Sequence, residues 1–472
     1  MFSRLSVYVF LLLFVSACSN KATVDSTTVK STAVKSATVK KDAKEAVAPA
    51  ASPSPVLAAP RRVMSKGKAS GASSASVRSA PAPVSASRVA KKIASGKGSS
   101  RKPQPGILTA GEIDDNLNLA AFKRYIHNIK KKNSKLRQYP TVTSHNVVRI
   151  QVVDSTGRGV SNARLKIGGR PYYTRTDGFF YFYPGYELPS LNSNSFPVAL
   201  MSSNPNSSRV IEEALVSTKA KGVYKIVLRG EQNNLPKALD LMFVIDTTGS
   251  MGDELRYIKS ELKGIINRVK RIHPETSIRY GLVVYRDVTD DYVVRSYPFQ
   301  TSLAKMETLL AKQTANGGGD YPEALDAAVE KAVRANWGTG NRARLMFLIA
   351  DAPPHSKNVG KALQAAKIAH QKGIRIYPVG ASGVADEAEY IMRNMAVISN
   401  GRYQFLTDDS GVGNSHQEPH VACYVVTRLN QLITRTISSE LSGRRVEPTK
   451  AEMIRRVGKY DNGVCHTSHK TN

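Results

Sequence analysis

One stretch, from Leu241 to Glu254, constrains the fold of this 472-residue chain more than any other. It opens with an uninterrupted apolar run from Leu241 to Ile245, continues through a turn rich in hydroxyl and carboxylate groups, and is followed by apolar residues at helical spacing. Uninterrupted apolar runs are typical of strands that are covered on both faces, and such strands occur mainly in parallel sheets flanked by helices. The stretch therefore predicts a buried strand, a polar turn and an amphipathic helix in succession.

The rest of the C-terminal half repeats this alternation of strand and helix. The alternation predicts an α/β domain over residues 235–441, with a doubly wound, mostly parallel sheet and helices on both faces. In sheets of this kind, ligands bind at the carboxyl ends of the strands. Further strands are expected at residues 278–285, 293–297, 345–350, 374–379 and 403–406, and helices near residues 301–313, 321–335, 357–372, 385–397 and 421–441.

The polar turn carries the clearest chemistry in the chain. Asp246, Thr248 and Ser250 occupy alternate positions, so one carboxylate and two hydroxyls can converge on a small cation. Mg²⁺ is the expected ion, because it takes oxygen ligands and keeps open or water-filled positions, and Mn²⁺ and Ca²⁺ are the alternatives. Asp351 follows a second buried run, which places it at the same edge of the predicted sheet. A cation with an open position favours metal-dependent binding of an outside ligand.

The spacing Asp246-x-Thr248-x-Ser250 resembles the signature of von Willebrand factor A domains, and the resemblance covers about residues 237–441. It implies a metal-ion-dependent adhesion site with Asp351 at its distal position. The middle loop, where the family has a threonine, reads Gly-Gly-Gly-Asp-Tyr-Pro-Glu-Ala and places Asp320 there. This loop and the later Asp-Ala-Pro-Pro-His resemble the hemicentin-like and bacterial branch of the family. The implied metal ligands are Asp246, Thr248, Ser250, Asp320 and Asp351.

Asp320 departs from the family pattern and leaves two alternatives open. A third carboxylate either strengthens cation binding or neutralises the cation so far that an acidic ligand is attracted less. Asp320 is also suited to capping a helix that has Pro322 in its first turn, and Thr314 is then a weaker substitute ligand.

The first 18 residues have the features of an export signal. Arg4 precedes an apolar run over residues 7–15 that is too short to span a bilayer comfortably. The run ends in Val-Ser-Ala-Cys18, which resembles a bacterial lipobox whose cysteine is lipidated, for example with palmitate. An ordinary secretory signal is the alternative. With Ser19 next, the resemblance implies a protein anchored by lipid in the bacterial outer membrane, and either periplasmic or exposed at the surface.

Residues 19–105 are rich in Ala, Ser, Pro and Lys and account for much of the net charge of +31. Such a segment cannot bury enough apolar surface to offset its ordering entropy, so it is expected to be a disordered tether. Binding of its lysines to anionic envelope polymers is the alternative. Residues 106–140 are expected to form a helical segment, with the helix at about residues 112–136.

Residues 141–230 change to a period of two, which predicts a small all-β sandwich. Val148, Ile150 and Val152 alternate with other residues, and Thr-Asp-Gly at residues 176–178 makes a tight turn before an aromatic strand. The order of these strands and turns resembles the carboxypeptidase-regulatory or transthyretin-like family. The resemblance implies a spacer or a binding module.

Cys423 and Cys465 remain once Cys18 is assigned to lipidation. An exported protein meets oxidising conditions, so the pair is expected to form one disulfide that joins the tail of residues 442–472 to the last helix. Free thiols are the alternative.

These features favour binding over catalysis. The chain has no phosphate-binding Gly-Lys-Ser loop, no Gly-x-Ser-x-Gly elbow and no His-Glu-x-x-His helix, so an enzyme is not expected. The leading hypothesis is an envelope protein, anchored in the membrane by lipid, that binds a protein or another acidic envelope ligand through a divalent cation. The alternative is a structural scaffold in which the metal only braces loops. No nucleic acid is expected, because the export signal removes the chain from that compartment.

Overall fold

The structure is a computed structural model that describes residues 107–142, 146–232, 234–411 and 416–466. The predicted signal peptide, the lipobox residue Cys18 and the linker of residues 19–105 lie outside the described residues. The described residues belong to one compact unit. Among them, no helix combines the length and the apolar character needed to cross a membrane.

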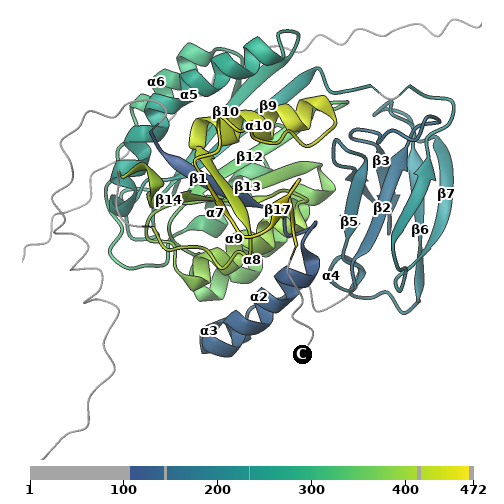
Figure 1. The fold of residues 1–472 in the computed structure, drawn as a ribbon, viewed down its shortest axis with the longest axis horizontal. Helices are drawn as coiled ribbons and strands as arrows, with labels where there is room; N and C mark the ends of the chain where they lie inside the picture. The colour runs from purple at the N-terminus through teal and green to yellow at the C-terminus, as the bar shows by residue number, and fades with distance from the viewer. Residues whose placement is uncertain (1–106, 143–145, 233, 412–415, 467–472) are drawn as a thin grey trace, which may run out of the picture. The chain divides into compact units, whose positions relative to one another are not determined.

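A nine-stranded sheet forms the centre of this unit (Figure 1), with the strand order β11-β10-β9-β12-β13-β14-β1-β15-β16. Five consecutive strands, from β10 to β14 in this order, are parallel, which confirms the predicted mostly parallel sheet. The strands are β9 (Ala238–Asp246), β10 (Ser277–Tyr285), β11 (Val294–Gln300), β12 (Ala343–Ala350), β13 (Ile374–Gly380), β14 (Tyr403–Thr407), β1 (Thr109–Ile113), β15 (Tyr424–Arg428) and β16 (Arg455–Val457).

Helices cover both faces of this sheet, as the alternating pattern predicts (Figure 1). One face packs against α5, α6 and α10, and the opposite face against α7, α8 and α9. Successive residues of β9 alternate between the two layers: Phe243 joins the first and Val244 the second. The helices are α5 (Gly252–Ile272), α6 (Leu303–Ala311), α7 (Leu325–Val333), α8 (Val359–Gln371), α9 (Asp386–Ile398) and α10 (Leu429–Ser442).

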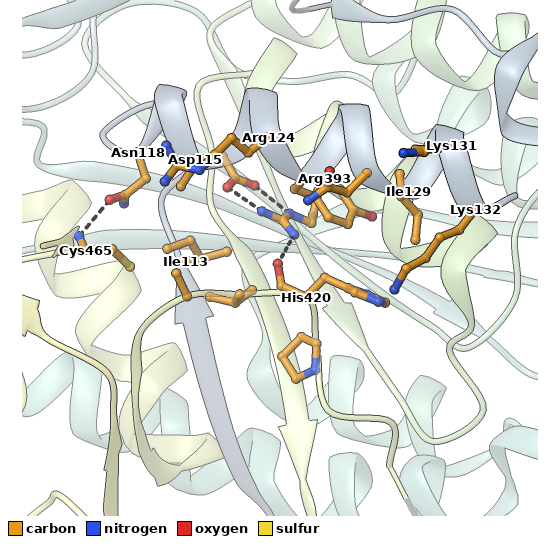
Figure 2. A pocket seen from close by; sticks show the side chains of 16 residues that line it. Ile113, Asp115, Asn118, Arg124, Ile129, Lys131, Lys132, Arg393, His420 and Cys465 are labelled. Carbon is orange, nitrogen blue, oxygen red and sulfur yellow. Dashed lines mark hydrogen bonds and ion pairs between the residues drawn. The ribbon is translucent and has the colours of Figure 1, made fainter. Parts of the chain in front are cut away.

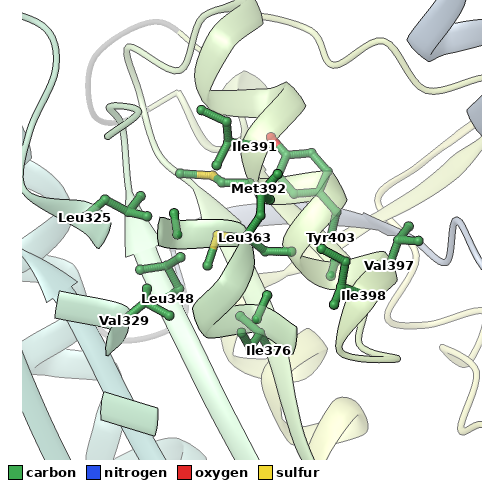
Figure 3. Packing of buried hydrophobic residues seen from close by; sticks show 14 of the residues in the cluster. Leu325, Val329, Leu348, Leu363, Ile376, Ile391, Met392, Val397, Ile398 and Tyr403 are labelled. Atoms are coloured by element: carbon green, nitrogen blue, oxygen red, sulfur yellow. The ribbon is translucent and has the colours of Figure 1, made fainter. Parts of the chain in front are cut away.

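The second of these layers is a dry core of interlocking aliphatic side chains. Figure 3 shows Leu325 and Val329 of α7 and Leu363 of α8 gathered with Leu348 of β12 and Ile376 of β13. All five side chains are at most 1% exposed. Burial of this kind stabilises each such side chain by about 1.5–3 kcal/mol, and it fixes the sheet edge from which the polar loops emerge.

The first strand corrects the predicted helical segment of residues 106–140. Residues Thr109–Ile113 form β1, which pairs antiparallel with both β14 and β15 inside the large sheet. The helix begins only at Leu119, because Asp114 to Asn118 form a turn held by the Asp114 carbonyl. The sequence Thr-Ala-Gly-Glu-Ile has no strand periodicity, so its extended form depends on pairing with β14 and β15. Two helices follow β1, namely α2 (Leu119–Lys132) and α3 (Ser134–Arg137).

The C-terminal end of the sheet corrects two further boundaries. The helix predicted at residues 421–441 is preceded by strand β15, because Tyr-Val-Val-Thr favours an extended backbone. The segment of residues 442–472, predicted to be a tail, supplies the edge strand β16 and a short hairpin. The predicted α/β domain therefore extends beyond residues 235–441 in both directions. The hairpin strands are β17 (Tyr460–Asp461) and β18 (Val464–Cys465).

Cys423 and Cys465 are joined by a disulfide across a separation of 42 residues, with a Cα–Cα distance of 5.5 Å. The bond ties the hairpin to the start of β15. We expect Cys465→Ser to lower the free energy of unfolding by about 2–4 kcal/mol, because a loop of this length then regains entropy in the unfolded chain. Denaturant unfolding with and without reductant checks this. Reductant should weaken the wild type and leave Cys465→Ser unchanged, and equal sensitivity of both would contradict it.

Between β1 and β9 the chain forms two small sheets, ordered β5-β2-β8 and β4-β3-β6-β7. Apolar side chains of both sheets, among them Val148, Leu165, Phe180 and Phe196, make one buried cluster of their own. The likeness to the carboxypeptidase-regulatory family stays a prediction. The strands are β2 (Val148–Val153), β3 (Arg164–Ile167), β4 (Arg170–Tyr173), β5 (Phe179–Phe182), β6 (Ser195–Met201), β7 (Val210–Ser217) and β8 (Val223–Val227), and α4 (Pro184–Glu187) follows β5.

Candidate metal centre

Strand register brings Asp246 and Asp351 to the same edge of the sheet. Parallel strands β9 and β12 pair Ile245 with Ile349, so Asp246 ends β9 and Asp351 follows β12 one residue after Ala350. Asp246 is fully buried and Asp351 is 3% exposed. The edge is the carboxyl end of the parallel strands, where ligands bind in sheets of this type.

The turn after β9 is organised around the Asp246 carboxylate. Asp246 Oδ1 accepts hydrogen bonds from the Thr248 backbone N–H at 2.9 Å and from the Thr248 hydroxyl at 2.7 Å. The hydroxyls of Thr248 and Ser250 lie 3.4 Å apart. Thr248 is buried, whereas Ser250 is exposed in the short 3-10 turn Gly249–Met251 that leads into α5. Along the motif, the side chains therefore pass from buried at the end of the strand, at Asp246, to exposed at the surface, at Ser250.

A glycine loop closes against this turn. The backbone N–H of Gly249 donates to the Gly317 carbonyl at 3.2 Å, and the N–H of Gly318 donates to both oxygens of Asp290 at 3.0 and 2.9 Å. Both loop glycines have positive φ, +77° and +73°, a backbone region that favours glycine. A Cβ on Gly318 would lie 3.0 Å from Glu323 Oε1 and 3.3 Å from Thr248 Cβ. Small residues therefore let the loop approach the motif closely.

Glu323 is a further buried carboxylate beside Asp246 and Asp351. Glu323 is 3% exposed, and a parallel backbone bridge to Pro354 ties it to the loop that follows Asp351. Asp320 is exposed on the glycine loop. Thr314 is exposed as well, and its carbonyl accepts a hydrogen bond from Arg286 at 2.9 Å. The Glu323 side chain is buried because the backbone bridge to Pro354 fixes its position.

Burial raises the pKa of four carboxyl groups at this edge. For Asp246, burial and then the neighbouring Asp351 raise the pKa to about 8. Burial raises the pKa of Asp351 to about 6. Burial, followed by the charges of Asp246, Asp287 and Asp351, raises that of Glu323 to about 9. Burial raises the pKa of Glu254, in the first turn of α5, to about 7. Negative charge is therefore unfavourable here unless a positive charge joins it.

Unpartnered oxygen atoms show that the residues fit a hard divalent cation. Asp246 Oδ2, Asp351 Oδ1 and Glu323 Oε2 are buried and have no hydrogen-bond partner within the described ranges. Buried carboxylate oxygens without partners are costly unless they bind an ion. Across the same ranges, no three acidic, histidine or cysteine side chains are arranged to hold a metal ion by themselves. A cation here would therefore need the hydroxyl oxygens of Thr248 and Ser250 as well.

Three further residues support the site and lie outside the set of ligands predicted from the sequence. Glu254 accepts hydrogen bonds from the backbone N–H of Ser382, at 3.3 Å, and from its hydroxyl, and so connects α5 to the loop after β13. Asp290 holds the glycine loop from a turn after β10. For Glu323, the one signal was its place three residues after the loop aspartate. Each acts through a loop from another part of the chain, which sequence spacing does not reveal.

The histidines near this edge each contact a different carboxylate. His355 Nε2 lies 2.7 Å from Asp287 Oδ1, His416 Nδ1 lies 2.7 Å from Asp408 Oδ1, and His420 Nδ1 lies 2.9 Å from Glu389 Oε2. They hold loops in place and do not converge on one point.

Comparison with known proteins agrees with this geometry. The von Willebrand factor type A domain family matches residues 240–417. The chain contains a von Willebrand factor A domain. Such domains often mediate protein interactions through sites that depend on a metal, and they commonly bind a divalent cation. The match begins inside β9 and ends before β15, so it leaves out β1, β15 and β16 of the same sheet.

Individual relatives resemble only part of the chain. An alpha-protein kinase of Dictyostelium discoideum is 31% identical over 121 residues, which are 25% of this chain and 19% of the kinase. The chain spans less than a fifth of the curated relatives that it matches. The solved structure of BatB from Bacteroides thetaiotaomicron is 16% identical, has a TM-score of 0.31, and covers 43% of this chain and 99% of its own. An aerotolerance-related membrane protein from Bacteroides fragilis is also 16% identical, with a TM-score of 0.29 over 43% of this chain and 98% of its own.

Proposed function

We propose that this chain is an exported envelope protein, anchored by lipid at Cys18, that binds a macromolecular partner through a divalent cation at the carboxyl edge of its von Willebrand factor A domain. Mg²⁺ is the expected ion. The observation that carries the proposal is the pair of buried carboxylates, Asp246 and Asp351, whose unpartnered oxygens lie beside the hydroxyls of Thr248 and Ser250. Burial of two ionised carboxylates without a positive charge would be costly, whereas oxygen-rich pairs of this kind suit a hard cation.

The protein side chains divide the work of binding. Asp246 and Asp351 supply negative charge from the buried side, and Thr248 fixes the orientation of Asp246 through two hydrogen bonds. Gly249 and Ser250 are exposed, so solvent reaches the site on the side of these two residues. A bound cation supplies a positive centre for a carboxylate of the partner. The exposed ring of Tyr321, which is 39% accessible, lies next to this opening and offers an apolar contact.

Titration of the full chain with Mg²⁺, Mn²⁺ and Ca²⁺ by calorimetry tests the metal site. We expect saturable binding by the wild type and a loss of about 100-fold or more in Asp246→Ala, because that variant removes a ligand and not only its support. Glu323→Gln should weaken binding by about tenfold, since Glu323 contributes negative charge near the ion.

Asp320→Ala is the matched control, because it removes a carboxylate from the same loop at an exposed position. It should change affinity by no more than about twofold, as expected of a surface charge in water. Equal losses in Asp320→Ala and Glu323→Gln would restore Asp320 as the third carboxylate. Absence of binding in the wild type, or full binding by Asp246→Ala, would exclude the metal site. A cellular partner retained in chelator would favour the scaffold alternative.

A further inference from the structure

A cavity lies between α2 and the segment of residues 419–422, away from the candidate metal centre, with a volume of about 770 Å³ (Figure 2). Its size is that of a site for a small ligand or for a few residues of a peptide. Hydrophobic side chains form much of its lining, and Cys465 of the disulfide also lines it. The apolar lining residues include Ile113, Ala121, Ile129, Pro419, Val421 and Ala422.

The charges at the floor of this cavity are already satisfied. The Arg393 guanidinium donates to both oxygens of Asp115, at 2.9 and 2.7 Å, and to Glu389 Oε1 at 2.9 Å. Its remaining contact is the carbonyl of His420, also at 2.9 Å. Figure 2 shows the bonds from Arg393 to Asp115 and to the His420 carbonyl. The Arg393 cation is therefore fully engaged by protein acceptors and offers no free positive charge to a ligand.

The rim, in contrast, carries positive charge without partners. Arg124, Lys131 and Lys132 line the cavity from α2, and all three are exposed. None of them forms an ion pair with a carboxylate in the part of the chain that the structure describes. Figure 2 shows Lys132 reaching from the helix toward His420. Cations in a last helical turn are common, but here they border an apolar cavity together with Arg124, more than a turn earlier.

A buried hydroxyl adds a hydrogen-bonding group to this lining. Tyr125 is 7% exposed and lines the cavity, and its hydroxyl has no hydrogen-bond partner among the described residues. Its ring lies 3.8 Å from the Arg393 guanidinium, which holds it in place. A buried hydroxyl that lacks a partner is costly, so this wall of the cavity holds a polar group that no described protein atom satisfies.

One loop connects this cavity to the metal centre. His420 contacts Glu389 at 2.9 Å and Asp386 at 4.0 Å, both in the first turn of α9. The residues just before α9 border Asp351: a Cβ on Gly383 would lie 3.5 Å from Asp351 Oδ2. The N–H of Ala385 donates to the Tyr321 hydroxyl at 2.8 Å, and that hydroxyl donates to the Asp351 carbonyl at 3.3 Å. The two sites therefore lie on either side of the same short loop.

We propose that the cavity is a docking groove for an acidic segment of the partner protein. An apolar side chain of that segment enters between α2 and residues 419–422, and its flanking carboxylates contact Arg124, Lys131 and Lys132. The choice of an acidic segment follows from charge complementarity, because Arg124, Lys131 and Lys132 at the rim form no ion pair among the described residues, whereas Arg393 is already bound by Asp115 and Glu389. The inference rests on the proposed function, since it supplies a second contact for a partner whose carboxylate binds at the metal centre.

Binding of a labelled peptide tests the groove directly. The probe is a fluorescein-labelled peptide with a central photoreactive leucine flanked on each side by two glutamates, and the comparison peptide has glutamines in their place. Fluorescence anisotropy with the full chain, in chelator, should show saturable binding of the acidic peptide only. The double variant Lys131→Glu, Lys132→Glu should weaken binding by about tenfold or more, because it places like charges opposite the peptide.

Lys123→Glu is the matched control, since Lys123 is exposed on the same helix but does not line the cavity. It should leave the affinity within about twofold of the wild type. Photocrosslinking should attach the probe at Ile129 or Val421. No saturable binding, equal binding of the glutamine peptide, or equal losses in Lys123→Glu and the double variant would overturn the proposal, as would exclusive binding to vesicles containing phosphatidylglycerol. Asp246→Ala should bind the acidic peptide normally, so failure of the metal site and failure of the groove are separate results.

Discussion

A fragment that begins at Leu235 is expected to be recovered unfolded or aggregated, although it contains every residue that matches the von Willebrand factor A domain family. The fragment lacks β1, which lies between β14 and β15 in the large sheet. Its loss would leave the facing backbone groups of both strands without partners. It would also remove Leu108 and Ala110 from the core and expose the apolar side chains that pack with them, such as Leu406. Circular dichroism melts of this fragment and of one that begins at Ile107 check the prediction.

A point variant tests the pairing of β1 in a chain whose length is unchanged. Gly111 lies against the rings of Phe405 and Tyr424, where an added Cβ would come within 2.7 Å of the first and 2.9 Å of the second. Gly111→Val should therefore lower the free energy of unfolding by about 1–3 kcal/mol. Gly264, in α5, has open space at its Cβ position, so Gly264→Ala should be neutral or stabilising by up to about 1 kcal/mol. Equal, cooperative melts of the two fragments would contradict the role of β1.

Without a divalent cation, the protein should lose stability as the pH rises from about 4 to about 9. The pKa of Asp246 is raised to about 8 and that of Glu323 to about 9 in the folded protein, so the folded state holds protons that the unfolded chain releases. Stability from such groups is complete below their unfolded pKa values and is lost as the pH passes through the folded ones. The shift of Asp246 alone corresponds to a loss on the order of 5 kcal/mol.

Chemical denaturation in chelator, at several values between pH 6 and pH 9, measures this loss. Mg²⁺ at 100 times its dissociation constant at high pH should restore about 2.7 kcal/mol there. The same concentration should restore less at lower pH, where protons compete for the ligands. The variant Asp246→Asn with Glu323→Gln keeps the side-chain shapes but cannot ionise at these positions. It should have a flatter pH profile and no response to Mg²⁺. A flat wild-type profile in chelator would contradict the raised pKa values.

The strengths and errors of the sequence interpretation have separate physical causes. The apolar run of β9 and the helical spacing of α5 are local patterns with strong periodicity, and both were predicted within a few residues. The strand β1 carries no such pattern, because its extended form depends on partners almost 300 residues away, such as Thr407 opposite Thr109. Strand β15 was assigned to a helix because the apolar run Tyr-Val-Val adjoins a true helix and is too short to show its own period.

The candidate site divides in the same way. Asp246, Thr248 and Ser250 are three residues in one turn, and their alternate spacing alone predicts that their oxygens converge. Asp351 could be added because buried parallel strands end at a common edge. The buried position of Glu323 depends on a backbone bridge between Glu323 and Pro354, which connects two loops. No spacing within either loop reveals that contact.

The sequence by itself determined the α/β class of the C-terminal domain, the oxygen-rich turn and the position of Asp351, because each depends on short-range periodicity or on the ends of predictable strands. Only the tertiary structure decided that β1 completes the sheet, that Glu323 faces the buried carboxylates, and that a basic groove beside α2 shares a loop with the metal centre. These features arise where segments far apart in the chain come into contact, and the direction of a side chain at such a contact is set by packing and not by local spacing.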